Sequence, residues 1–179
     1  MRTQLLLAGV LALCVTQTVS AQVRKGLKEY NATAHVTAYS NEGESVSVVQ
    51  LQGRLGIFLT RTVELGPSLA LNKFEDVDTF GSLGGFAHFH FGSPGARSVP
   101  YVGAELAFAL NDDECFPIVV TCGSAVGAVG GAKFFLGQNG AFVVEAFVTQ
   151  LDFDDDEDDI FDDDDVTAFG IRLGMSLFK

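Results

Sequence analysis

From about residue 31 onward, apolar residues alternate with small or polar ones over segments of ten or so residues, and polar or turn-forming stretches separate the segments. A period of two is typical of β-strands, because successive side chains point to opposite faces of a sheet. Eight such segments predict an all-β chain. The expected strands span residues 31–40, 46–59, 63–72, 81–92, 99–110, 124–137, 140–152 and 165–178.

The connections between these strands alternate in length. Those at 60–62, 93–98 and 138–140 are short and built from turn formers, whereas the others are mostly longer and acidic. The longer group comprises 41–45, 73–80, 111–123 and 153–165. Short turns at one end and long loops at the other are expected of a transmembrane barrel, with the turns periplasmic and the loops extracellular. The pattern predicts an eight-stranded antiparallel up-and-down transmembrane β-barrel.

The distribution of charge agrees with this topology. Nineteen of the 23 Asp and Glu residues lie at the expected extracellular end, and six of the ten basic residues after residue 21 lie at the opposite end. The formal net charge of −12 also excludes a nucleic acid as partner, because phosphate binding requires clustered Lys and Arg.

Residues 1–21 are predicted to be a cleaved signal peptide. Arg2 precedes an apolar run over 5–15, and the small residues Val19-Ser20-Ala21 are typical of a cleavage site. Residues 22–179 are then expected to form a single barrel domain. No later apolar run approaches the ~18 residues that a transmembrane helix needs, so the chain would cross a membrane with strands.

The two faces of each strand can be assigned from energetic cost. An Arg or Lys that faces lipid near the bilayer midplane costs about 2 to 4 kcal/mol, so charged positions are expected inside the barrel. This rule places three groups in the interior: Glu64, Gly66, Ser68 and Ala70; Tyr101, Gly103, Glu105 and Ala107; and Arg172, Gly174 and Ser176. The leucines and valines between them are expected to face lipid.

Six mid-strand charges are predicted to form an interior network. Its members are Arg54, Glu64, Glu105, Lys133, Glu145 and Arg172. Three acids and three bases balance, and an eight-stranded barrel is just wide enough for side chains to fill it, which favours a paired polar core over an open pore. The alternative is that some of these residues lie near strand ends in water, without partners.

Residues 53–69 (GRLGIFLTRTVELGPSL) resemble the strand, turn and strand unit of small outer-membrane β-barrel proteins of the porin-like superfamily. Residues 100–104 resemble the start of a mid-chain strand in that family, and 131–145 resemble a second turn unit. The resemblance covers nearly all of 31–179. It implies a location in the outer membrane, contact with outer-membrane lipid and insertion by the barrel assembly machinery. Family members usually end on an aromatic residue, whereas this chain ends Phe178-Lys179.

The segment 152–165 contains eleven acids among fourteen residues. Calcium accepts many carboxylate ligands, and the candidate ligands are Asp154, Asp156, Asp158, Asp162 and Asp164. The glycine that ordered calcium loops use for their turn is missing, so a solvated acidic loop is the favoured interpretation. No other cofactor is expected.

Cysteine and histidine provide two further candidate sites. Cys115 and Cys122 lie seven positions apart, and oxidising conditions outside the cell favour a disulfide, which would contribute roughly 2 to 3 kcal/mol. His88 and His90 share the interior face of one strand and could form a metal pair. No nearby Cys or acid is identified to complete a tetrahedral set, so a role in the polar core is favoured.

These features predict a non-enzymatic barrel that acts in envelope structure, adhesion or surface interaction with an ion or ligand, with an extracellular partner that the sequence does not identify. One alternative is a soluble secreted or periplasmic barrel with a small apolar ligand, which would turn the apolar residues inward. A second is a lipid-modifying barrel enzyme with a Ser-His-acid arrangement, for which no nucleophile signature is found.

Overall fold

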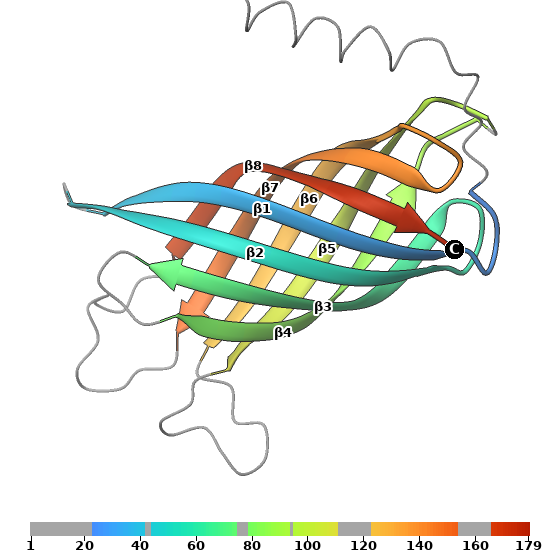
Figure 1. The fold of residues 1–179 in the computed structure, drawn as a ribbon. Coiled ribbons are helices and arrows are strands. Elements are labelled where there is room, and N and C mark those ends of the chain that lie inside the picture. Colours follow the sequence, from blue (N-terminus) through green and yellow to red (C-terminus); the bar gives the residue numbers. More distant parts are fainter. Residues whose placement is uncertain (1–22, 42–43, 75–78, 94, 111–122, 154–165) are drawn as a thin grey trace, which may run out of the picture.

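The computed structural model describes residues 23–41, 44–74, 79–93, 95–110, 123–153 and 166–179. Eight strands form one closed sheet in which each strand pairs antiparallel with the next and β8 pairs with β1 (Figure 1). The strands are β1 (Lys28–Asn41), β2 (Glu44–Phe58), β3 (Val63–Phe74), β4 (Phe80–His90), β5 (Ser98–Leu110), β6 (Gly123–Phe135), β7 (Gly140–Phe153) and β8 (Val166–Phe178). The predicted eight-stranded antiparallel barrel is confirmed.

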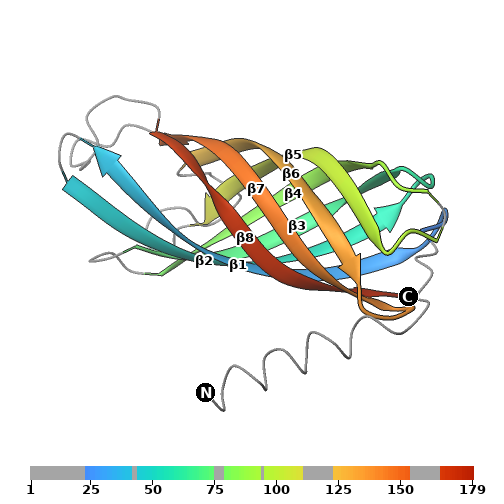
Figure 2. The ribbon, with the colours of Figure 1, turned by 90° about the horizontal axis from the view of Figure 1, so that it is seen from above.

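The two ends of the barrel differ in their connections. The links β2–β3, β4–β5 and β6–β7 lie at one end together with Lys179, and we call it the short-turn end (Figures 1 and 2). Strands β1, β3, β5 and β7 end at the opposite end of the barrel, which we call the long-loop end. The link from β1 to β2 is shorter than the predicted 41–45, because Asn41 already pairs with Glu44.

Strand β1 begins three residues earlier than the sequence predicts. Lys28 and Glu29 are charged and hide the alternation, but Glu29 pairs with Gly56 on one side and with Phe178 on the other. Closure of the barrel therefore extends the strand. Among the described residues, no helix is long and apolar enough to cross a membrane.

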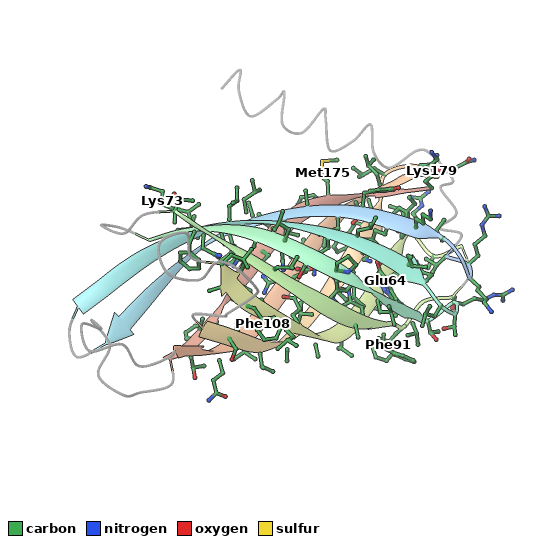
Figure 3. The ribbon with its side chains drawn as sticks, turned by 90° about the horizontal axis from the view of Figure 1, so that it is seen from below. Glu64, Lys73, Phe91, Phe108, Met175 and Lys179 are labelled. Carbon is green, nitrogen blue, oxygen red and sulfur yellow. The ribbon has the colours of Figure 1, made fainter. Side chains whose placement is uncertain are left out.

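Side chains alternate between a buried interior and an exposed apolar exterior. Glu64, Ser68 and Ala70 of β3 are buried, whereas Leu65, Leu69 and Leu71 are 41–55 % exposed. Figure 3 shows Phe91, Phe108 and Met175 on the outside of the barrel, and Lys73 and Lys179 at opposite ends. The predicted faces of β3, β5 and β8 are confirmed.

The interior changes in character along the barrel axis. Near the short-turn end it holds an apolar cluster of Phe58, Val99, Phe135, Ala141 and Phe178, on which Val23 and Leu27 pack. Toward the long-loop end, the inward positions are mostly small. They include Ser82, Gly84, Ala107, Ala109, Ala125, Gly127 and Gly170, all partly exposed. Charged side chains occupy the layer between these regions.

Candidate functional site

All six charged residues of the predicted network point into the barrel. They come from six different strands: Arg54 on β2, Glu64 on β3, Glu105 on β5, Lys133 on β6, Glu145 on β7 and Arg172 on β8. The Glu105 side chain is 12 % exposed and the other five are nearly or fully buried. Their positions follow from the period of two, since each occupies an inward position near the middle or the short-turn half of its strand.

Two arginines and two glutamates form the centre of this network. Arg54 donates a hydrogen bond of 2.8 Å to Glu105 Oε1 and another to Glu145. Arg172 donates to Glu105 Oε2 at 2.6 Å and lies 3.8 Å from Glu145 Oε2. Each carboxylate therefore faces both guanidinium groups, which offsets the large cost of burying a charge.

A second group of charges lies nearer the short-turn end. Lys133 Nζ donates to Glu64 Oε2 at 2.9 Å and also to Glu29, and His90 Nε2 lies 2.9 Å from the same Glu64 oxygen. Ser176 donates to the other oxygen of Glu29 at 2.6 Å. The ammonium group thus has two carboxylate partners.

Asn31 connects the two groups. Its amide nitrogen donates to Ser176 Oγ at 2.8 Å, and its amide oxygen accepts a 2.9 Å hydrogen bond from Arg54. Tyr101 hydroxyl donates to Glu145 as well. The interior charges therefore form one continuous hydrogen-bonded network that crosses the barrel.

Glu29 is a further interior acid that was not predicted, and the predicted balance of three acids and three bases is wrong for that reason. Glu29 is 1 % exposed, so the described interior holds four acids against three bases, Arg54, Lys133 and Arg172. The alternation of polar residues from Glu29 through Asn31 and Thr33 was the signal that could have placed it inside. The described part of the interior thus carries one excess negative charge when its four acids are ionised and its histidines are neutral.

The expectation that no acid lies near His88 and His90 is also wrong, because Glu64 lies beside both rings. Antiparallel pairing of β3 with β4 sets Glu64 directly opposite His88, which a search along the chain does not reveal. His88 and His90 are 3 % and 1 % exposed, and both rings pack against Tyr101, with ring centroids 4.9 and 5.2 Å apart. The three groups lie close enough to hold a metal ion together.

Two glycines make room for these side chains. A Cβ atom on Gly56 would collide with the carboxylate of Glu64, and one on Gly103 would collide with the imidazole of His88. Gly56 occupies an inward position on β2, next to β3, and Gly103 occupies one on β5, next to β4. An eight-stranded barrel has little free width at such positions. Glycine at these two positions therefore leaves the space that the side chains of Glu64 and His88 occupy.

Two predicted sites lie outside the described residues. The calcium candidates Asp154, Asp156, Asp158, Asp162 and Asp164 fall within 154–165, and Cys115 and Cys122 fall within 111–122. Both therefore stay predictions.

Solved structures of similar architecture are known. The N-terminal β-barrel domain of Pseudomonas aeruginosa OprF matches with a TM-score of 0.54 and 21% identity, over 87% of this chain and 98% of that one. Neisserial surface protein A matches with a TM-score of 0.60 and 14% identity, over 86% and 97% of the two chains. The fold is that of a small transmembrane β-barrel.

A de novo designed transmembrane β-barrel has this fold too, with a TM-score of 0.51 and 13% identity over 88% of this chain and 99% of the designed one. A designed barrel shares no ancestry with natural chains, so its similarity reflects the strand number and alternation of faces. No protein-family model and no curated protein sequence matches this chain.

Proposed function

We propose that the chain is a non-enzymatic outer-membrane barrel that anchors acidic extracellular loops in the cell envelope, and that its interior does not conduct ions. The observation that carries this proposal is the continuous apolar exterior of a closed barrel. The signal peptide predicted over residues 1–21 supports export of the chain.

The exterior is unsuited to water. The large apolar side chains that are at least 39 % exposed include Val49, Leu51, Leu55, Ile57, Leu65, Leu69, Leu71, Leu83, Val102, Leu106, Val126, Val148, Ile171, Leu173, Met175 and Leu177. Such a surface far exceeds the few hundred Å² of contiguous apolar patch that soluble monomers expose. The hydrocarbon core of a lipid bilayer is a suitable environment for this surface.

Exposed aromatic residues occur toward both ends of this belt. Tyr30, Phe89 and Phe91 lie near the short-turn end, and Phe108 and Phe169 lie toward the long-loop end. Transmembrane barrels carry aromatic girdles at the two interfaces of the membrane. Phenylalanine and tyrosine take this role in a chain that has no tryptophan.

The alternative of a soluble barrel with an apolar ligand requires the opposite arrangement of faces. Its apolar residues would line the interior, where this barrel holds Arg54, Glu105, Glu145 and Arg172 in mutual contact. The same contacts, together with the phenylalanine cluster at the short-turn end, support a closed interior. With the interior closed by its charged layer and its phenylalanine cluster, the acidic loops are the part left to meet a partner or ion, in adhesion or in envelope structure.

Membrane insertion is tested by fractionation and by electrophoresis of the full chain without boiling. We expect the protein in the outer-membrane fraction and a band that shifts on heating, because a detergent-stable barrel unfolds only then. A soluble protein without a heat shift would contradict the proposal.

The closed interior is tested by single-channel recording with the same purified barrel in a planar lipid bilayer. Conductance at the background level is the expected result, and a steady ion current would refute this part of the proposal. Incubation of the barrel with phospholipid and lipid A vesicles tests the enzymatic alternative, since turnover in either would favour it.

A further inference from the structure

We propose that Glu64, His88 and His90 form a site for a divalent transition-metal ion of the zinc class inside the barrel. Two imidazole nitrogens and one carboxylate oxygen are a ligand set that zinc uses with a fourth position left for water. This site goes beyond the anchoring role proposed above and depends only on the folded barrel.

The donor atoms already converge. All three lie within 4.8 Å of one another, and Glu64 Oε2 is 2.9 Å from His90 Nε2 and 3.8 Å from His88 Nδ1. Ligand atoms around tetrahedral zinc lie about 3.3 to 3.6 Å apart, because each bond is about 2.0 to 2.2 Å long. Small side-chain rotations are therefore enough to bring the three atoms to bonding geometry.

The histidines have nitrogens available for a metal. Neither ring nitrogen of His88 hydrogen-bonds to any of the described residues, and Nε2 of His90 contacts the Glu64 carboxylate that would share the metal with it. A buried polar atom without a partner is unfavourable, and a metal on Nδ1 of His88 would remove that cost. Nε2 of His88 would then face Glu105 Oε1 at 3.9 Å, which resembles the carboxylate–histidine–metal arrangement of zinc sites.

The charges of the interior also favour a cation. Among the described residues, the four interior acids Glu29, Glu64, Glu105 and Glu145 face three bases, which leaves one excess negative charge when all four acids are ionised and the histidines are neutral. Zinc with a bound hydroxide carries one positive charge and matches it. Lys133 is the cation that now contacts Glu64, and its second hydrogen bond, to Glu29, lets the ammonium keep a partner when a metal takes the Glu64 oxygen.

The test uses the full mature chain refolded in detergent with Co²⁺ and then desalted in excess Ca²⁺. Calcium occupies oxygen-rich loop sites, whereas tetrahedral Co²⁺ with nitrogen ligands gives intense visible absorption. We expect about one Co²⁺ per barrel, displaced by one equivalent of Zn²⁺. The variants H88Q and H90Q should lose the absorption, and the heat shift on a gel checks that each has folded.

His35→Gln is the matched control. His35 is also buried in the interior, on β1, but it packs against Phe147 with ring centroids 4.6 Å apart and belongs to no described metal cluster. The H35Q variant should bind Co²⁺ like the unmodified chain. Absence of tetrahedral Co²⁺ in the unmodified folded barrel, or its retention in a folded H90Q variant, would overturn the proposal.

Discussion

The two halves of the barrel interior solve the problem of filling an eight-stranded barrel in different ways. The half toward the short-turn end is filled by aromatic rings and by paired charges, and residues such as Ala141 and Glu145 are fully buried there. The half toward the long-loop end is lined mostly by alanine, glycine and serine, many of them partly exposed.

This difference indicates which half of the interior contributes more to the stability of the fold. Both halves have the same strand pairing, so the backbone hydrogen bonds do not distinguish them. What differs is the number of buried side chains with specific partners. Substitutions in the filled half should therefore be costly, whereas equivalent changes in the half lined by small residues should be tolerated.

The largest effect is expected for Glu145→Ala. Glu145 is fully buried and contacts Arg54, Arg172 and Tyr101, so its removal leaves the two buried guanidinium groups to share the carboxylate of Glu105. We expect the free energy of unfolding to fall by about 3 to 5 kcal/mol in urea titrations of the barrel in lipid vesicles. Thr149→Ala, on the same strand in the other half, should cost less than about 1 kcal/mol. Equal losses would contradict the difference between the halves.

A smaller effect is expected for a charge on the outer face. Leu69 is 55 % exposed near the middle of β3, and Leu69→Arg should cost about 2 to 4 kcal/mol in vesicles, since the guanidinium would face hydrocarbon. Leu136 lies just beyond the end of β6, so Leu136→Arg should cost only about 0 to 1 kcal/mol of unfolding free energy. Similar values at the two positions would show that lipid does not cover the middle of the barrel.

A third experiment adds volume to each half. Ala141 is fully buried in the apolar cluster, and Ala141→Leu should cost about 1 to 3 kcal/mol through overpacking. Ala107 points inward in the other half and is partly exposed, so Ala107→Leu should be nearly neutral. Urea unfolding midpoints of the two variants measure the difference directly, and a reversed order would show that the long-loop half is the tightly packed one.

The smallest effect is expected for the polar contacts near the long-loop end. Asn72 accepts a hydrogen bond from Gln50 at 2.5 Å and donates one to Ser82 at 3.2 Å. Asn72→Ala should cost about 0.5 to 1.5 kcal/mol, because water can reach part of this region. A loss as large as that of Glu145→Ala would place a tightly coupled network in both halves.

The sequence by itself was enough to predict the fold. Alternation along β3, β5 and β8 determines which residues point outward, because a strand side chain points either inward or outward and a charged side chain is costly on the outer face. The same rule placed Arg54, Lys133 and His88 in the interior. The start of β1 was missed, since Glu29 looks like part of a polar terminus until Phe178 of β8 is seen to pair with it.

Only the tertiary structure decided which interior residues touch. Glu64 and His88 are 24 positions apart in the chain and become direct neighbours through the register of β3 and β4. Glu29 and Lys133 meet across the barrel from strands β1 and β6. The period of two determines the face of a residue, but barrel closure and strand register determine its height and its partners. The charge network and the proposed metal site follow from these contacts.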